Sequence, residues 1–183
     1  MTKQESILLF NSLHPSFFDQ DDIRNLPVDW IFDEMILALD NFEPSKYKRK
    51  LDGNISFGYY HGDIAGIKRA VEKVDTDWAQ YYTEEQRIYC GYADGKAVSF
   101  CIIADLGVHN INGQKVKVGG PGCVGTIPRY RDKGIGLTMV KNVTRILKEE
   151  GYDYSYIHYT SEARWYEKLG YQISVRWTGK GIL

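Results

Sequence analysis

The stretch "YRDKGIGLTMV", residues 130–140, decides the fold because it joins two closely spaced glycines to the start of an apolar helical pattern. A helix N-terminus presents unpaired backbone N–H groups and a partial positive charge, and glycines let a phosphate approach that backbone. Gly134 and Gly136 therefore indicate a phosphate site, with added charge from Arg129, Arg131 and Lys133. Close packing at a strand-to-helix turn is the alternative, because neither a P-loop nor a complete dinucleotide fingerprint is present.

The residues on either side of this stretch predict a mixed α/β fold. The helix that it begins stops at Gly151, and "YDYSYIHYT", "SEARWYEKL" and "YQISVRWTG" follow as strand, short helix and last strand. Upstream, the pairs Asp94-Gly95 and Asn112-Gly113 predict two hairpins and thus three antiparallel strands. This order predicts a central sheet with a crossover around the helix.

The segment "GGPGCVGT", residues 119–126, is unusual for a strand. Its glycines weaken a strand, and Pro121 cannot donate to a ladder. We interpret the segment as a strand that bulges away from its neighbour and lets another backbone-like group approach. An irregular loop is the alternative.

The first 53 residues are interpreted as an N-terminal helical extension that packs on a single globular unit formed by residues 54–183. Asp29 can cap a helix with one apolar face, formed by Ile31, Phe32, Met35, Ile36 and Leu39. The basic run "KYKRK", residues 46–50, is interpreted as a solvated linker rather than a nucleic-acid patch.

Between this extension and the hairpins, the sequence predicts one strand and two helices. "ISFGYY" is strand-like, and Asp63 can cap a helix that carries Ile67, Ala70, Val71 and Val74. A second, short helix would start near residue 75 or 76 and bury Trp78 with Tyr81 or Tyr82.

Composition argues against several functional classes. The 183-residue chain has 23 basic and 24 acidic side chains and a formal net charge of -1, so no global field favours nucleic acid or an anionic membrane. The three cysteines are far apart and form no close pair of the zinc-binding or redox kind. The apolar run near the start is too short for a signal peptide or a membrane span. We therefore expect a cytoplasmic protein without a metal.

The combination of these motifs resembles the GNAT superfamily of acyl-CoA-dependent N-acyltransferases over about residues 55–178. The family signature [Q/R]-x-x-G-x-[G/A] is matched by Arg131, Gly134 and Gly136, and "VGTIP" matches the strand end before it. The later run "YEKLGY", residues 166–171, matches a run that is typical of the family. The resemblance implies a central mixed, mostly antiparallel sheet that is splayed at the family's fourth and fifth strands, with helices on both faces.

The resemblance also implies acetyl-CoA as cosubstrate. In the family, pantetheine lies between the splayed strands like an extra strand, and the pyrophosphate rests on the backbone amides of the signature. On this chain, the implied pantetheine site is Val124, Gly125 and Thr126. The implied pyrophosphate site is Arg131, Asp132, Lys133, Gly134, Ile135 and Gly136.

For catalysis, the resemblance implies direct attack of a neutral amine on the thioester, with Tyr166 as the general acid that protonates the leaving thiolate. Many relatives carry a glutamate on the fourth strand, but residues 114–126 contain no acid. Asp105, His109 and His158 remain alternatives for the base. The asparagine that is frequent before the family's late helix is also missing here.

We therefore expect an N-acetyltransferase that moves an acetyl group from acetyl-CoA to a primary amine in a ternary complex, with a small-molecule acceptor favoured over a protein. Two alternatives stay open: a non-catalytic acyl-CoA sensor, which the missing acid favours, and a covalent acyl-cysteine enzyme that uses Cys123 with His158. Two roles are open for the extension, which would cover the acceptor site or mediate a homodimer.

Overall fold

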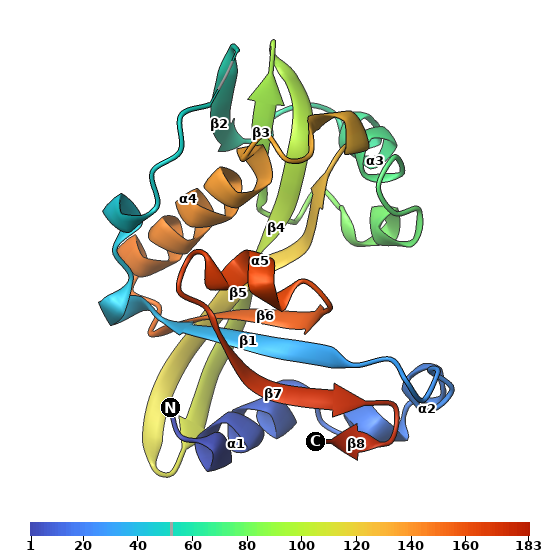
Figure 1. Cartoon of the computed structure of the whole chain (residues 1–183), viewed down its shortest axis with the longest axis vertical. Coiled ribbons are helices and arrows are strands. Elements are labelled where there is room, and N and C mark those ends of the chain that lie inside the picture. The colour runs from blue at the N-terminus through green and yellow to red at the C-terminus, as the bar shows by residue number, and fades with distance from the viewer. Residues whose placement is uncertain (52) are drawn as a thin grey trace.

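The computed structural model describes residues 1–51 and 53–183, which form an eight-stranded mixed sheet flanked by helices (Figure 1). The sheet order is β2-β3-β4-β5-β6-β1-β7-β8. The strands are β1 (Phe32–Ala38), β2 (Ile55–Tyr59), β3 (Ile88–Ala93), β4 (Lys96–Ile111), β5 (Gln114–Thr126), β6 (Tyr154–Thr160), β7 (Gln172–Thr178) and β8 (Gly181–Ile182). Neighbouring strands are antiparallel except β5 and β6, which are parallel. The predicted mixed, mostly antiparallel sheet is confirmed.

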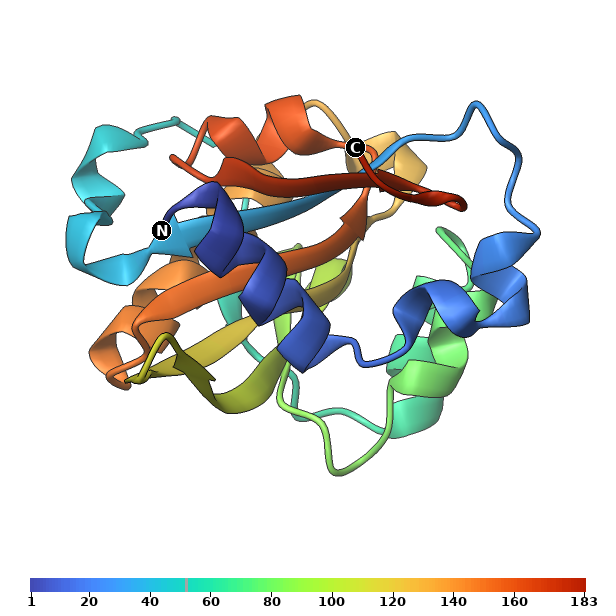
Figure 2. The ribbon, with the colours of Figure 1, turned by 90° about the horizontal axis from the view of Figure 1, so that it is seen from below.

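Helices cover both faces of this sheet. The α-helices are α1 (Lys3–Leu13), α2 (Asp21–Arg24), α3 (Ile64–Val71), α4 (Ile135–Glu149) and α5 (Ala163–Glu167), and 3-10 turns span Phe17–Asp19, Leu39–Asn41, Pro44–Lys46, Asp77–Tyr81 and Pro128–Tyr130. Leu9 of α1 packs in one core with Ile36 of β1, whereas Val143 of α4 packs in another with Met35. Because successive strand residues point to opposite faces, α1 and α4 lie on opposite sides of the sheet. In Figure 2, α1 lies in front of the strands.

Residues 32–38 form strand β1, so the helix predicted to follow Asp29 is wrong. β1 pairs with β6 on one side and with β7 on the other, inside the same sheet as the later strands. Its middle residues are buried, and a strand covered on both faces reads as a continuous apolar run. Such a short run cannot be distinguished from a buried helix by periodicity alone. The first 53 residues therefore contribute a central strand as well as helices.

The two predicted hairpins and the cap of α3 are confirmed. Asp94 and Gly95 join β3 to β4 with φ angles of 49° and 74°, and Asn112 and Gly113 join β4 to β5 with 52° and 85°. The Asp63 carboxylate accepts a hydrogen bond of 2.6 Å from the backbone N–H of Gly66. The predicted second short helix is the 3-10 turn Asp77–Tyr81. Tyr82 after it is buried, but Tyr81 is exposed.

Strands β5 and β6 separate soon after they meet, which confirms the predicted splay. Their register contains only two pairs, Val118 with Tyr154 and Gly119 with Ser155. Beyond them, β5 stays with β4 and leaves β6 (Figure 1). Among the helices that the structure describes, none is both long and apolar enough to cross a membrane.

Candidate active site

A cavity of about 500 Å³ lies where β5 has left β6 and α4 begins. Its wall combines the end of β5, the start of α4, helix α5 and the connector before β2. Eight of the nine predicted cofactor-binding residues line it, namely Val124, Gly125, Thr126, Arg131, Asp132, Gly134, Ile135 and Gly136. The ninth, Lys133, is not in the wall, and its ammonium lies 5.4 Å from the ring centre of Tyr130. The fold thus brings the two predicted subsites together.

The N-terminus of α4 opens into this cavity through glycine backbone. Gly134 is the N-cap with φ 80°, and no described side chain caps the helix by a hydrogen bond. At Gly136, a Cβ atom would lie 2.6 Å from the Thr126 hydroxyl oxygen, so a side chain there would crowd the end of β5. The first N–H groups of the helix are therefore available to an anion in the cavity.

The end of β5 is bulged and is anchored from the β4 side. Phe100 pairs with Gly125 and Ile102 with Gly122, so both Cys123 and Val124 lie opposite Cys101. Cys123 adopts the left-handed region with φ 46°, and its carbonyl accepts a hydrogen bond of 2.7 Å from the Tyr82 hydroxyl. A bulge of this kind turns the backbone away from its ladder. It leaves backbone groups near Val124 without a partner in the β4 register.

Side chains also fix the two residues that follow Val124. The Ser99 hydroxyl donates to the Gly125 carbonyl at 2.9 Å, and the Ser99 and Thr126 hydroxyls are 2.9 Å apart. The Arg131 guanidinium donates to the Thr126 carbonyl at 3.1 Å. These bonds hold the strand end next to α4 in one conformation.

Tyr166 of α5 is a hydroxyl donor in the wall of the cavity. Its side chain is 7% exposed, and its ring packs edge-on against Trp165 at 4.8 Å. Burial raises the pKa of Tyr166 above its usual value near 10, and the Tyr171 phenol raises it further. The hydroxyl therefore keeps its proton at neutral pH.

The three predicted candidates for the base are not in the lining of this cavity. Asp105 is exposed on β4 and accepts a hydrogen bond of 2.9 Å from the backbone N–H of Gly107. The His109 ring lies between the Ser12 hydroxyl at 2.7 Å and the Leu106 carbonyl at 2.8 Å. His158 is hydrogen-bonded to Glu34. The carboxylates that do line the cavity belong to Asp132 and Glu162.

Two residues of the cavity were missed because they belong to the basic run that looks like a linker. Tyr47 and Arg49 lie in the wall, and the Arg49 guanidinium donates to the Asp132 carbonyl at 2.7 Å. The Arg49 side chain also lies over the Cα atom of Gly134. The basic run "KYKRK" could have indicated an anion site. Its composition does not show that this segment lies next to α4 in the fold.

Comparisons with known proteins agree with this geometry. A family model described as an acetyltransferase (GNAT) domain matches residues 61–174. A search of curated proteins finds no match. Among solved structures, the chain resembles the GCN5-related glucosamine N-acetyltransferase region of a fungal multi-domain GH3 β-N-acetylglucosaminidase, with 18% identity, a TM-score of 0.64 and coverage of 82% of this chain and 20% of that chain.

Two bacterial structures are also similar. A GCN5-related N-acetyltransferase from Kribbella flavida has 15% identity and a TM-score of 0.55, covering 82% of this chain and 57% of that chain. A GCN5-related N-acetyltransferase from Sphaerobacter thermophilus has 18% identity and a TM-score of 0.57, covering 81% of this chain and 50% of that chain. The chain thus spans less than two thirds of each of these structures, and at such identities they show a shared fold. Because the family model spans more than half of the sequence, the chain belongs to the family of GNAT acetyltransferase domains.

Proposed function

We propose that this protein is an N-acetyltransferase that moves an acetyl group from acetyl-CoA to a primary amine in a ternary complex. The observation that carries the proposal is the meeting of three features in one cavity. These are the glycine-lined start of α4, the free backbone at the end of β5, and the buried Tyr166 hydroxyl. An anion site, an extended-chain site and a proton donor are what a CoA thioester requires.

Acetyl-CoA would bind with its pyrophosphate at the start of α4 and its pantetheine along β5. The amides from Lys133 to Gly136 would donate to the phosphate oxygens, and the guanidinium groups of Arg49 and Arg131 would add positive charge. Pantetheine would pair with the backbone from Val124 to Thr126, because β6 has already separated from β5 at that level.

In the transfer step, the lone pair of a neutral amine attacks the thioester carbonyl carbon. The carbon–sulfur bond of the resulting tetrahedral intermediate then breaks, and the thiolate takes the Tyr166 proton to leave as CoA. The backbone N–H of Val124 would stabilise the oxyanion. The proton that the nitrogen releases passes to solvent. The products are an N-acetylamide and free CoA.

For the acceptor we favour a small-molecule amine. The cavity has aromatic walls at Trp78 and Trp165, which suit an apolar or cationic group. The second candidate function is an acyl-CoA sensor without turnover. The position of Asp105, His109 and His158 outside the cavity favours this alternative, whereas Tyr166 in the wall favours the enzyme.

The experiment that tests the proposal is calorimetric titration with acetyl-CoA and CoA, followed by an amine panel monitored for free thiol. Binding with amine-dependent thiol release is expected. Binding of acetyl-CoA without thiol release for any amine would favour the sensor. Absence of acetyl-CoA binding would contradict both the enzyme and the sensor.

A matched pair of variants tests the placement of the pyrophosphate. Gly134→Asp puts a carboxylate at the start of α4 and should abolish CoA binding. Gly151→Asp is the control, because Gly151 has a similar φ of 75° against 80° but lies beyond the other end of α4. Equal CoA affinity in the two folded variants would contradict this placement.

A further inference from the structure

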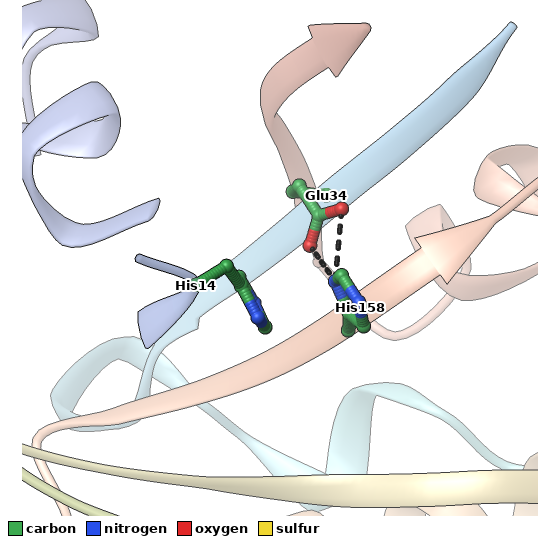
Figure 3. A group of neighbouring side chains, drawn as sticks. All are labelled: His14, Glu34 and His158. Carbon is green, nitrogen blue, oxygen red and sulfur yellow. Dashed lines mark hydrogen bonds and ion pairs between the residues drawn. The ribbon is translucent and has the colours of Figure 1, made fainter. Parts of the chain in front are cut away.

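Two histidines and a glutamate meet on the face of the sheet that α1 covers (Figure 3). His14 follows the end of α1, Glu34 belongs to β1 and His158 to β6. Each offers one ligand atom, and the three atoms lie within 4.8 Å of one another. Ile157 packs in the core of α4, so the next residue, His158, points to the opposite face of the sheet. The group is therefore separate from the cavity described above.

Glu34 presents both carboxylate oxygens to His158, because Nδ1 lies 3.1 Å from Oε1 and 2.9 Å from Oε2. Glu34 is fully buried, and Oε1 accepts from the Trp177 indole N–H at 2.7 Å and from the Tyr159 backbone N–H at 3.2 Å.

The sheet is deformed around Glu34 on both sides. Between β1 and β6, Asp33 pairs with Thr160 and Met35 pairs with Ile157. Two residues of β6, His158 and Tyr159, therefore lie opposite the single residue Glu34 of β1. In β7, an extra residue, Ser174, enters the register beside Glu34, and its hydroxyl donates to the Glu34 carbonyl at 3.1 Å.

The deformation includes a strained backbone at Tyr159, whose φ is 56° although it is an aromatic residue. Bulges and strained residues re-aim side chains and cluster at functional sites. The two bulges therefore indicate that this arrangement of Glu34 and His158 is specified by the fold.

One buried polar atom beside this carboxylate lacks a partner. Nε2 of His14 makes no hydrogen bond within residues 1–51 and 53–183. The His14 ring is stacked on His158 at 3.9 Å and lies 6.0 Å from the Tyr156 ring. A buried polar atom without a hydrogen-bond partner often marks the position of a bound water or ion.

We propose that His14, Glu34 and His158 form a binding site for a divalent transition-metal ion of the Zn²⁺ type. Imidazole and carboxylate ligands suit Zn²⁺ and its neighbours, whereas Ca²⁺ and Mg²⁺ require oxygen ligands. Ligand bonds of about 2.0–2.2 Å in a tetrahedron place ligand atoms about 3.3 Å apart. The contact of 2.9 Å between Glu34 and His158 is close to that separation.

Metal binding would replace the hydrogen bond between Glu34 and His158. The His158 ring would change tautomer, with its proton moving through solvent from Nδ1 to Nε2, and the ion would lie between Nδ1 and Oε2. His14 would turn out of its stacked position to bring its lone pair to the ion. Trp177 and Tyr159 would keep Oε1 in place as outer-shell donors. Three protein ligands leave the fourth position open.

The test is a titration of the chelator-treated full chain, without a polyhistidine tag, with Co²⁺ and Zn²⁺. We expect one equivalent of Co²⁺ to give visible d–d absorption, Zn²⁺ to abolish it, and Zn²⁺ to raise the Tm by mass action. His14→Gln should weaken Co²⁺ binding by more than the roughly 10–100-fold cost of losing an outer-shell partner. This variant carries the test because His14 is only partly buried, whereas Glu34 is in the core.

His61→Gln is the matched control, because His61 is exposed and lies outside the group. This variant should bind Co²⁺ as the unchanged chain does. Absence of a Co²⁺ spectrum together with an unchanged Tm in Zn²⁺ would overturn the proposal in favour of a water among the buried polar atoms. Equal binding by the unchanged chain and His14→Gln would also overturn it. Neither result depends on acetyl transfer.

Discussion

At the scale of single residues, two side chains distinguish direct attack of the amine from covalent catalysis, namely Tyr166 and Cys123. Tyr166 has a raised pKa and lines the cavity, so it is protonated at neutral pH. Cys123 lies in the bulge of β5, but burial raises the pKa of its thiol to about 11. We therefore expect substitution of Tyr166 to lower the rate of acetyl transfer and substitution of Cys123 to leave it unchanged.

Tyr166→Phe should lower kcat by about 100-fold or more, because a positioned general acid contributes roughly 10²–10⁴-fold. The Kd for acetyl-CoA should change little, since the phosphate and pantetheine contacts remain. Thiol release and calorimetry measure the two quantities. Tyr156→Phe is the control, because Tyr156 is buried in the core that α1 covers and is not in the cavity wall. An unchanged kcat in Tyr166→Phe would remove this residue from the mechanism.

Cys123 should react slowly with iodoacetamide near pH 7.5, and its alkylation rate should rise as the pH approaches about 11. The thiolate is the reactive form, and it forms only as the pH reaches the raised pKa. Mass spectrometry of the alkylated peptide measures the rate. Cys123→Ser should keep acetyl transfer if the amine attacks the thioester directly. Fast alkylation at pH 7.5, or an acylated Cys123, would support the covalent alternative instead.

At the scale of elements, the connector before β2 and the start of α4 form one structural unit. The Arg49 guanidinium binds the Asp132 carbonyl and covers Gly134, so a segment far away in sequence contributes charge beside the helix N-terminus. The helix supplies amides, and the connector supplies a cation. In the proposed phosphate site, the two elements would act together.

Arg49→Ala should weaken acetyl-CoA binding by about 10-fold or more, because a hydrogen bond to a charged group is worth about 1.5–3 kcal/mol. The loss should shrink at high salt, since the site is open to solvent. Lys50→Ala is the matched control, because Lys50 is exposed in the same run but is not in the cavity wall. Calorimetry at two salt concentrations measures both variants. Equal acetyl-CoA affinities of Arg49→Ala and Lys50→Ala would show that Arg49 does not contact the phosphates.

At the scale of the whole molecule, β1 connects the N-terminal residues to the rest of the sheet. It lies between β6 and β7, and Met35 is fully buried in the core that α4 covers. The core of the acetyltransferase fold is therefore built in part from residues before the stretch that the family model matches, 61–174.

Met35→Ala should lower the free energy of unfolding by about 2–5 kcal/mol, because it removes buried atoms and leaves a cavity. Urea unfolding followed by tryptophan fluorescence and by far-UV circular dichroism should give one shared, shifted transition. Val28→Ala is the control, since Val28 is 71% exposed, and its midpoint should hardly change. Two separate transitions, of which Met35→Ala shifted only one, would show that residues 1–53 unfold independently.

Much of the fold was determined by local signals in the sequence. The hairpins at Asp94 and Asn112 and the cap at Asp63 follow from turn and helix-end chemistry, which involves residues only a few positions apart. The glycines before α4 and within β5 likewise predicted a helix start with bare backbone and a bulged strand. The family resemblance implied the splayed sheet and the nine cofactor-binding residues, of which eight line one cavity and whose role stays a prediction. The family resemblance added Tyr166, which lies in the cavity wall. Its role as the general acid stays a prediction.

The tertiary structure alone decided where distant segments meet. A short apolar run did not distinguish strand β1 from a helix, because only its pairing with β6 and β7 makes it a strand. Arg49 reaches Gly134 only because the connector returns to α4. His14, Glu34 and His158 are separated by up to 144 residues and meet through sheet order and two bulges. Local sequence fixes turns and caps through contacts between near neighbours, whereas these sites depend on the path of the whole chain.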